Sequence, residues 1–179
     1  MQASIIFLLS LLSVASVAQT TAYDDFKLEE QQIIFQKVIE KEGVNYQKLN
    51  DYYSSLPYVS NIEVKTNAIN FVVKDIEVDY LKFQFSQVNT PLIMQSGKFS
   101  GKVSVSVRDG RYRVTFKEIQ LTGEIVYKSI KEKENLTDYA SRNSGTQLSP
   151  DWCRPNMLGL LAKAFTDKLE FKSDEDEEW

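Results

Sequence analysis

Histidine is absent from the 179 residues of this chain, and its absence removes several kinds of chemistry at once. No Ser-His-Asp triad or Cys-His pair can form, and no imidazole is available to bind a metal ion. No side chain has an ordinary pKa close to neutrality. The sequence therefore predicts no catalytic, metal-binding or cofactor-binding residue, and no cofactor.

Cysteine is nearly absent as well, since Cys153 is the only one. A single thiol excludes an intrachain disulfide and a zinc site built from several thiolates. Cys153 stands between Trp152 and Arg154, and a neighbouring cation can lower a thiol pKa and make the thiol reactive. The alternative is a small apolar side chain packed beside a tryptophan, and we favour it.

The first 23 residues lack charged side chains, and an apolar run over residues 5–17 fills most of them. This run of about 13 residues is shorter than the roughly 20 that span a membrane, and small residues follow at Ser16 and Ala18. Both features predict a secretory signal peptide over residues 1–18, with a mature chain that starts at Gln19. A buried N-terminal helix is the alternative.

We therefore expect an exported protein, periplasmic or secreted. No later stretch approaches the roughly 18 consecutive apolar residues of a transmembrane helix, so we expect a soluble product without a transmembrane anchor.

The formal net charge of −4 arises at the C-terminus, because five acidic residues in a row occupy positions 174–178. Without that run, 21 basic residues stand against 20 acidic ones. We expect residues 172–179 to form a solvated acidic tail. A calcium site would need oxygen ligands at defined spacing and a turn glycine, and the tail has neither. The pI of about 5.0 and the few cations make nucleic acid a poor candidate partner.

The length is typical of one domain, and the local composition divides the chain. Residues 19–31 are polar and acidic, and we interpret them as a flexible lead-in. A single α+β domain is expected over residues 32–171. Within it, residues 131–151 are polar throughout, and we interpret them as a long loop, although such a long structureless segment is unusual in a compact domain.

Apolar spacing predicts two helices and a first strand. The β-branched residues at 33–39 favour a strand. Asn45 can cap a helix that Pro57 ends, and the last helix begins near Asn156. The apolar positions at helical spacing are Tyr46, Leu49, Tyr53 and Leu56 in the first helix and Leu158, Leu161, Phe165 and Leu169 in the last.

Residues 61–86 alternate in the manner of β-strands. After Tyr80 the apolar positions shift from even to odd numbers, which predicts a bulge, or a break followed by another strand that ends near Ser86. Residues 87–97 contain proline and glycine, and we interpret them as a connector.

The strongest local signal is a β-hairpin over residues 98–121. Asp109-Gly110 favours a two-residue type I′ turn, in which both residues have positive φ. That turn sets the register, and every inward apolar residue then meets an apolar partner. The predicted pairs are Val107 with Tyr112, Val105 with Val114, and Val103 with Phe116.

The other face of this hairpin carries five cations and no acidic residue, and we predict a possible anion-binding face there. The cations are Lys102, Arg108, Arg111, Arg113 and Lys117. Like charges on facing strands are mildly destabilising, so something is expected to compensate them. Three interpretations stay open: the charges are solvated, they are neutralised from within, or they receive an anionic partner. The acidic groups considered for internal neutralisation are Asp75, Glu77, Asp79 and the tail.

The element order is β, α, four or more β, then α, behind a signal peptide. In this order and in several motifs the sequence resembles the domain of unknown function 4468 family, which comprises uncharacterised exported proteins of Bacteroidetes-type bacteria. The motifs are Ser16-Val17-Ala18-Gln19, Ile34-Phe35-Gln36-Lys37-Val38 followed by Gly43, the hairpin from Val105 to Phe116, and the helix near the C-terminus.

The resemblance covers about residues 24–170. It implies a TATA-box-binding-protein-like fold, an antiparallel sheet with two helices packed on one face in the order β-α-β-β-β-β-α. It implies no assigned activity and no site residue. The polar segment 131–151 and the acidic tail depart from the family pattern.

Three kinds of function are compatible with these features. We favour a non-enzymatic binding or interaction module of the cell envelope, whose partner is an anionic envelope glycan, a lipid head group or another protein. One alternative is a ligand carrier with an apolar pocket. The aromatic residues that could line such a pocket are Phe71, Tyr80, Phe83, Phe85, Tyr112 and Phe116.

The other alternative is a hydrolase with paired carboxylates. Asp75, Glu77 and Asp79 would project from one strand face about 7 Å apart, and glycosidases use two carboxylates at such separations. Acidic residues at alternate strand positions are more often a solvated face, and exposure of all three would favour the binding module.

Overall fold

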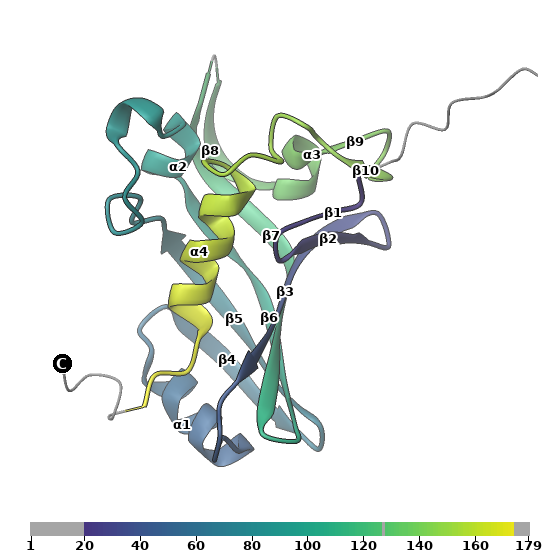
Figure 1. Ribbon diagram of the computed structural model, residues 1–179, viewed down its shortest axis with the longest axis vertical. Coiled ribbons are helices and arrows are strands. Elements are labelled where there is room, and N and C mark those ends of the chain that lie inside the picture. The colour runs from purple at the N-terminus through teal and green to yellow at the C-terminus, as the bar shows by residue number, and fades with distance from the viewer. Residues whose placement is uncertain (1–19, 127, 174–179) are drawn as a thin grey trace, which may run out of the picture.

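An antiparallel sheet of eight strands organises the molecule, in a computed structural model that describes residues 20–126 and 128–173. The strands follow the order β1-β2-β3-β7-β6-β5-β4, and β8 also pairs with β7 (Figure 1). A separate two-stranded sheet joins β9 to β10. The strands are β1 (Ala22–Tyr23), β2 (Phe26–Glu29), β3 (Gln32–Glu40), β4 (Val59–Lys65), β5 (Ala68–Glu77), β6 (Lys98–Arg108), β7 (Arg111–Ile125), β8 (Lys128–Asn135), β9 (Ser141–Arg142) and β10 (Gln147–Leu148).

Helices accompany this sheet, as the predicted α+β class requires. They are α1 (Tyr46–Ser55), the 3-10 helix η1 (Gln87–Asn89), α2 (Leu92–Ser96), α3 (Leu136–Ala140) and α4 (Leu158–Leu169). The observed order therefore contains more strands and helices than the predicted β-α-β-β-β-β-α. None of the helices in the described residues is long and apolar enough to cross a membrane. The predicted signal peptide and the acidic run at 174–178 lie outside the described residues.

Phe165 on α4 lies at the centre of the core between helix and sheet. Its ring centroid is 4.9–5.9 Å from four other rings, which come from β2, β3, β6 and β7. These rings are Phe26, Phe35, Phe99 and Phe116, and all are buried. Contacts of this kind hold α4 against one face of the sheet, where Figure 1 shows it crossing the strands.

Local sequence predicts the start of α1 and the face that it buries. The Asn45 side chain accepts a hydrogen bond from the Lys48 N–H at 2.9 Å and so caps the helix, as predicted. Leu49 and Tyr53, four residues apart, are both fully buried, and the Tyr53 ring lies 4.6 Å from that of Phe71 on β5. The predicted first helix is therefore confirmed, and it packs on the same face of the sheet as α4.

The predicted hairpin is also confirmed. Val105 pairs with Val114, and the other predicted pairs hold in the same register. Asp109 and Gly110 have φ values of 50° and 73°, as a type I′ turn requires. All inward residues of this hairpin except Val107 are buried, so the turn and the core select the same register.

Irregularities bend the long strands. On β5 the register shifts between Val73 and Ile76, where Asp75 has a φ of 54°. On β7, Glu118 has a φ of 51° opposite Gly101, and a Cβ on Gly101 would lie 2.7 Å from the Lys117 carbonyl oxygen. This second bulge places two successive side chains, those of residues 117 and 118, on one face of the sheet.

The edge strand β4 has an irregularity of its own. Its pairing with β5 shifts between Ser60 and Glu63, and Asn61 there has a φ of 54°. Glu63 and Lys65 are exposed at this edge, 3.6 Å apart. The sheet thus ends in a bent, charged strand.

The predicted flexible lead-in at 19–31 is wrong for the residues that the structure describes. Residues 22–29 contain β1 and β2, and β2 pairs with β3. Phe26 is only 1% exposed, and its ring lies 5.5 Å from that of Phe35. Phe26 thus anchors a segment that is otherwise rich in acidic and polar residues, together with the pairing of β2 and β3.

The predicted loop at 131–151 is wrong as well, because it contains the end of β8, α3, β9 and β10. The Asn135 side chain caps α3 by accepting from the Thr137 N–H at 2.9 Å. The Thr137 hydroxyl in turn accepts from the Ile33 N–H on β3 at 3.0 Å. Polar side chains therefore hold this segment in place through specific hydrogen bonds, which composition alone does not reveal.

The predicted strand that ends near Ser86 is absent from the structure, since residues 80–84 form turns and β5 ends at Glu77. The predicted connector at 87–97 holds η1 and α2. Ile93 and Met94 of α2 are buried in the core, which explains why this short helix forms.

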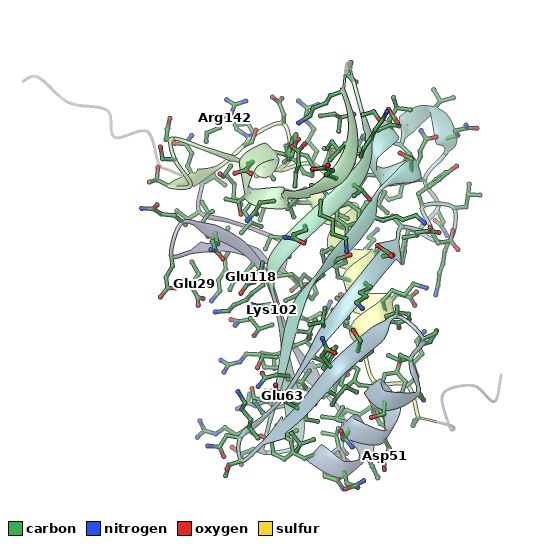
Figure 2. The ribbon with its side chains drawn as sticks, turned by 180° about the vertical axis from the view of Figure 1, so that it is seen from behind. Glu29, Asp51, Glu63, Lys102, Glu118 and Arg142 are labelled. Atoms are coloured by element: carbon green, nitrogen blue, oxygen red, sulfur yellow. The ribbon has the colours of Figure 1, made fainter. Side chains whose placement is uncertain are left out.

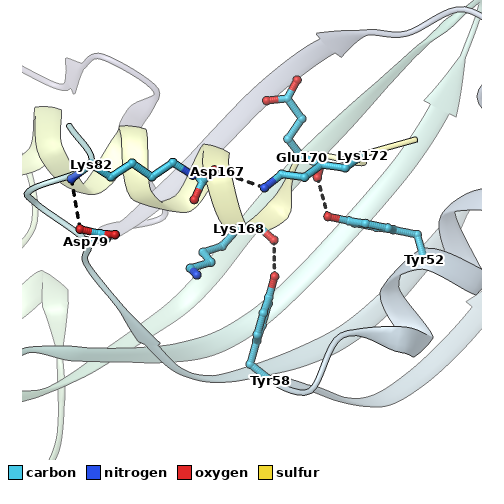
Figure 3. A network of polar contacts seen from close by, with 8 residues as sticks. All are labelled: Tyr52, Tyr58, Asp79, Lys82, Asp167, Lys168, Glu170 and Lys172. Carbon is cyan, nitrogen blue, oxygen red and sulfur yellow. Dashed lines mark hydrogen bonds and ion pairs between the residues drawn. The ribbon is translucent and has the colours of Figure 1, made fainter. Parts of the chain in front are cut away.

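Three tyrosines bind the C-terminal end of α4, and we call them the tyrosine latch; Figure 3 shows two of them, Tyr52 and Tyr58. Their hydroxyls donate to three consecutive main-chain carbonyls, which helix geometry leaves without partners. The pairs are Tyr52 with Glu170 (2.9 Å), Tyr53 with Leu169 (2.6 Å) and Tyr58 with Lys168 (2.7 Å). The latch therefore connects α1 and the start of β4 to the end of α4.

Replacing Tyr53 by Phe should lower the free energy of unfolding by about 1–3 kcal/mol, because the Leu169 carbonyl would lose its partner at a buried position. Tyr58→Phe is the matched control: Tyr58 is half-buried, so water can replace its hydroxyl and the loss should be smaller. Urea unfolding measures both variants. Equal losses would contradict the role given to burial.

Burial raises the pKa of Tyr53 and the pKa of Tyr58 above their ordinary value of 10.0. The unfolded chain therefore releases these protons at a lower pH than the folded protein does. The stabilisation is complete below about pH 10 and is lost as the pH rises from there through the higher folded pKa values. We expect Tm to fall above pH 10, and to fall less in the Tyr53→Phe, Tyr58→Phe double variant. Parallel Tm curves for the two proteins would rule out the latch as the titrating element.

Candidate binding face

The face of the sheet opposite α1 and α4 carries the five predicted cations, and we call it the open face. In Figure 2, which labels Lys102 and Glu118 there, strands β4 to β7 lie in front of α4 with no described helix crossing before them. Strand alternation produces this face: Val105 and Val114 point into the core, and their neighbours point away from it.

Strand register arranges the open-face side chains in rows across the sheet. From the hairpin turn inward, the rows are Arg108, Arg111 and Glu40; then Ser106, Arg113 and Val38; then Asn70, Ser104, Thr115 and Gln36; then Val72, Lys102 and Lys117. The predicted stripe is therefore interrupted. Three arginines lie near the turn, and two lysines lie beyond an uncharged row.

Acidic residues of this chain neutralise the two lysines. Lys102 lies 2.8 Å from Glu118, and Lys117 lies 2.9 Å from Glu29 on β2. The hydrogen bonds from Lys117 and Lys27 hold the pKa of the Glu29 carboxyl below its ordinary value. The prediction of a face without acidic residues is thus wrong, because other strands and the bulge on β7 supply them.

Sequence reasoning missed Glu29 and Glu118 for different reasons. Glu29 belongs to the segment interpreted as a lead-in, 88 residues away from Lys117 in the chain. Glu118 follows Lys117 directly and reaches the same face only through the bulge. The shift of apolar positions from Phe116 to Ile119, with a glycine on the facing strand, was a signal for that bulge.

The arginines have fewer ion-pair partners than the lysines. Arg108 lies 3.1 Å from Asp109, but both side chains are largely exposed, at 85% and 72%, so this pair is weak. Arg111 and Arg113 form no hydrogen bond or ion pair with any residue that the structure describes. Register places Glu40 across from Arg111 and the 54%-exposed Val38 across from Arg113.

A shallow depression of about 530 Å³ lies on the same face, and its lining residue Thr115 is one row from Arg113. The uncharged row contributes Asn70, Ser104 and Thr115, on three adjacent strands, to its lining. Charged side chains surround it: Glu63, Lys65, Lys102, Lys117 and Glu118. Its volume falls within the roughly 300–1,000 Å³ of small-molecule sites.

The three acidic residues proposed for a hydrolase do not form a pair. Asp75, Glu77 and Asp79 are all exposed. Glu77 lies 3.0 Å from Lys98, and Asp75 lies 3.9 Å from Lys133, whereas Asp79 accepts a hydrogen bond from a turn N–H. They also do not neutralise the five predicted cations, as one interpretation required. No cluster of three or more potential metal ligands occurs in the described part of the chain.

Core packing accounts for the aromatic residues proposed for a carrier pocket. Phe71, Tyr112 and Phe116 are buried in the core, while Tyr80, Phe83 and Phe85 are half-buried against it. Cys153 also packs on the core, and burial raises the pKa of its thiol, which disfavours the reactive thiolate.

No family model matches the chain, and no curated protein matches it. Two solved structures are similar to it. A TBP-like protein from Parabacteroides distasonis aligns over 78% of this chain and 88% of its own, with a TM-score of 0.44 and 12% identity. A DUF4468 family protein from Bacteroides ovatus aligns over 84% and 93%, with a TM-score of 0.45 and 13% identity. The family that the sequence resembles is thus also the family of the second structure.

Proposed function

We propose that the protein is a non-enzymatic binding module that acts outside the cytoplasm and binds an anionic partner on its open face. The observation that carries this proposal is the pair of guanidinium groups on β7, those of Arg111 and Arg113. Both are exposed, and neither has a partner among the described residues.

The geometry of the arginines suits an extended anion. Arg111 and Arg113 are two residues apart on one strand face, a separation of about 7 Å. Arg108 lies directly across from Arg111 on β6, so three positive charges gather near the hairpin turn. Each guanidinium can hold a carboxylate, sulfate or phosphate through two hydrogen bonds. A bound anion would also relieve the repulsion between like charges on facing strands.

Hydrogen bonds of Thr20 and Thr21 are compatible with the predicted cleavage after Ala18. The Thr20 carbonyl accepts from the Leu148 N–H at 2.7 Å, and the Thr21 carbonyl accepts from the Leu28 N–H at 2.9 Å. Both hydrogen bonds lie after Ala18, where the signal peptide is expected to end. Cleavage there would leave every described strand and helix intact.

The anion site can be tested with an acidic polysaccharide over a salt series. We expect wild-type binding to weaken as salt rises, and the Arg111→Ser, Arg113→Ser variant to bind about ten-fold more weakly at low salt, as the loss of two exposed ion pairs predicts. Arg142→Ser, Arg154→Ser is the matched control, because it removes the same charge from a cluster around Asp151. Equal weakening in both variants would place the interaction elsewhere.

Export has a separate test. Expressed with its signal peptide in a bacterial host, the protein should appear in the periplasm or medium with Gln19 as its first residue. N-terminal sequencing and intact mass measure this directly. A soluble protein that retains Met1 would overturn the export proposal without affecting the anion site.

A further inference from the structure

The depression beside Arg113 has a different chemistry from the arginines. One row of its lining holds an amide and two hydroxyls, on Asn70, Ser104 and Thr115, which are neighbours across β5, β6 and β7. Such groups both donate and accept hydrogen bonds but carry no charge. They suit a ligand with many hydroxyl groups.

Two of these side chains are available to a ligand. Asn70 and Ser104 are half-buried, and within the described residues neither side chain forms a hydrogen bond. The Thr115 hydroxyl accepts from the Gln36 amide at 3.1 Å, which holds it in position. Half-buried polar groups of this kind are satisfied by water, and a ligand hydroxyl can replace that water without loss of hydrogen bonds.

The positive and negative charges around the depression nearly cancel. Lys102 and Lys117 are paired with Glu118 and Glu29, and Lys65 lies 3.6 Å from Glu63. The unpaired positive charge begins one row further, at Arg113, about 7 Å along β7 from Thr115. The uncharged, hydrogen-bonding side chains of the depression therefore lie next to the cationic Arg113. The distance between them is comparable with the length of one pyranose unit.

We propose that the open face binds an acidic polysaccharide, with a sugar ring in the depression on Asn70, Ser104 and Thr115 and the acid group of a neighbouring ring at Arg113. This inference rests on the proposed anion binding at Arg111 and Arg113. An acidic polysaccharide carries both hydroxyl-rich rings and acid groups. The rings suit the uncharged polar side chains of the depression, and the acid groups suit Arg113. An acidic peptide offers charge without the hydroxyls, so it would use the arginines alone.

The test compares two polyanions of equal charge number, an oligogalacturonate and poly-glutamate, by titration at one low salt concentration. Wild type should bind the oligogalacturonate about ten-fold more tightly, the effect of two further hydrogen bonds. The Asn70→Ala, Ser104→Ala variant should lose that difference and bind poly-glutamate as wild type does. Asn50→Ala, Ser54→Ala, which removes the same side-chain types from α1, is the matched control and should behave as wild type.

The outcomes separate this inference from the proposed function. Equal binding of both polymers by wild type, or an unchanged preference in the Asn70→Ala, Ser104→Ala variant, would overturn the polysaccharide and leave the anion site standing. Stronger binding to vesicles with anionic lipids than to the oligogalacturonate would also overturn it. Unchanged binding of both polymers by Arg111→Ser, Arg113→Ser would overturn the anion site itself. If the double variant has a lowered Tm, Ser104→Ala alone should still reduce the preference about three-fold.

Discussion

The packing of α4 against one face of the sheet is the constraint on which the rest of the structure depends. Phe165 contacts rings from two strand pairs that are far apart in the chain, β2–β3 and β6–β7, and the tyrosine latch holds the C-terminal end of the same helix. With no disulfide available, this core and these hydrogen bonds carry the stability of the domain. Since one face of every central strand is filled by the core, strand alternation sends the charged residues to the other face.

The open face is therefore a consequence of burial, but its charge pattern depends on register and bulges. The bulge at Glu118 places a carboxylate next to Lys102, and the pairing of β2 with β3 brings Glu29 to Lys117. Both lysines are neutralised in this way. The arginines near the hairpin turn lie beyond the reach of these acids, so the free positive charge concentrates at one end of the face.

Sequence reasoning succeeded where the information is local. The hairpin has its turn signal and its apolar pairs within about 20 residues, and α1 has its cap and its stop within 13. It failed where long-range contacts decide. Phe26 lies in an acidic segment, yet its ring packs on Phe35 and the segment pairs with β3. Asn135 and Thr137 were assigned to a loop because of their polar surroundings. In the structure Asn135 caps α3, and the Thr137 hydroxyl joins α3 to β3. The five cations were predicted from the hairpin alone, but Glu29 reaches Lys117 from β2 and Glu118 reaches Lys102 only through a bulge. The depression requires three strands in register.

The bent edge strand β4 bears on how such a domain stays dispersed. Unpaired N–H and C=O groups along a sheet edge can recruit a strand from another molecule, and this is a common first step in aggregation. The left-handed residue Asn61 interrupts the edge, and the charges of Glu63 and Lys65 would have to be desolvated or faced with a complementary pattern. A flat, apolar edge would accept almost any extended chain. The kink and the charges therefore act as a barrier to edge-to-edge association.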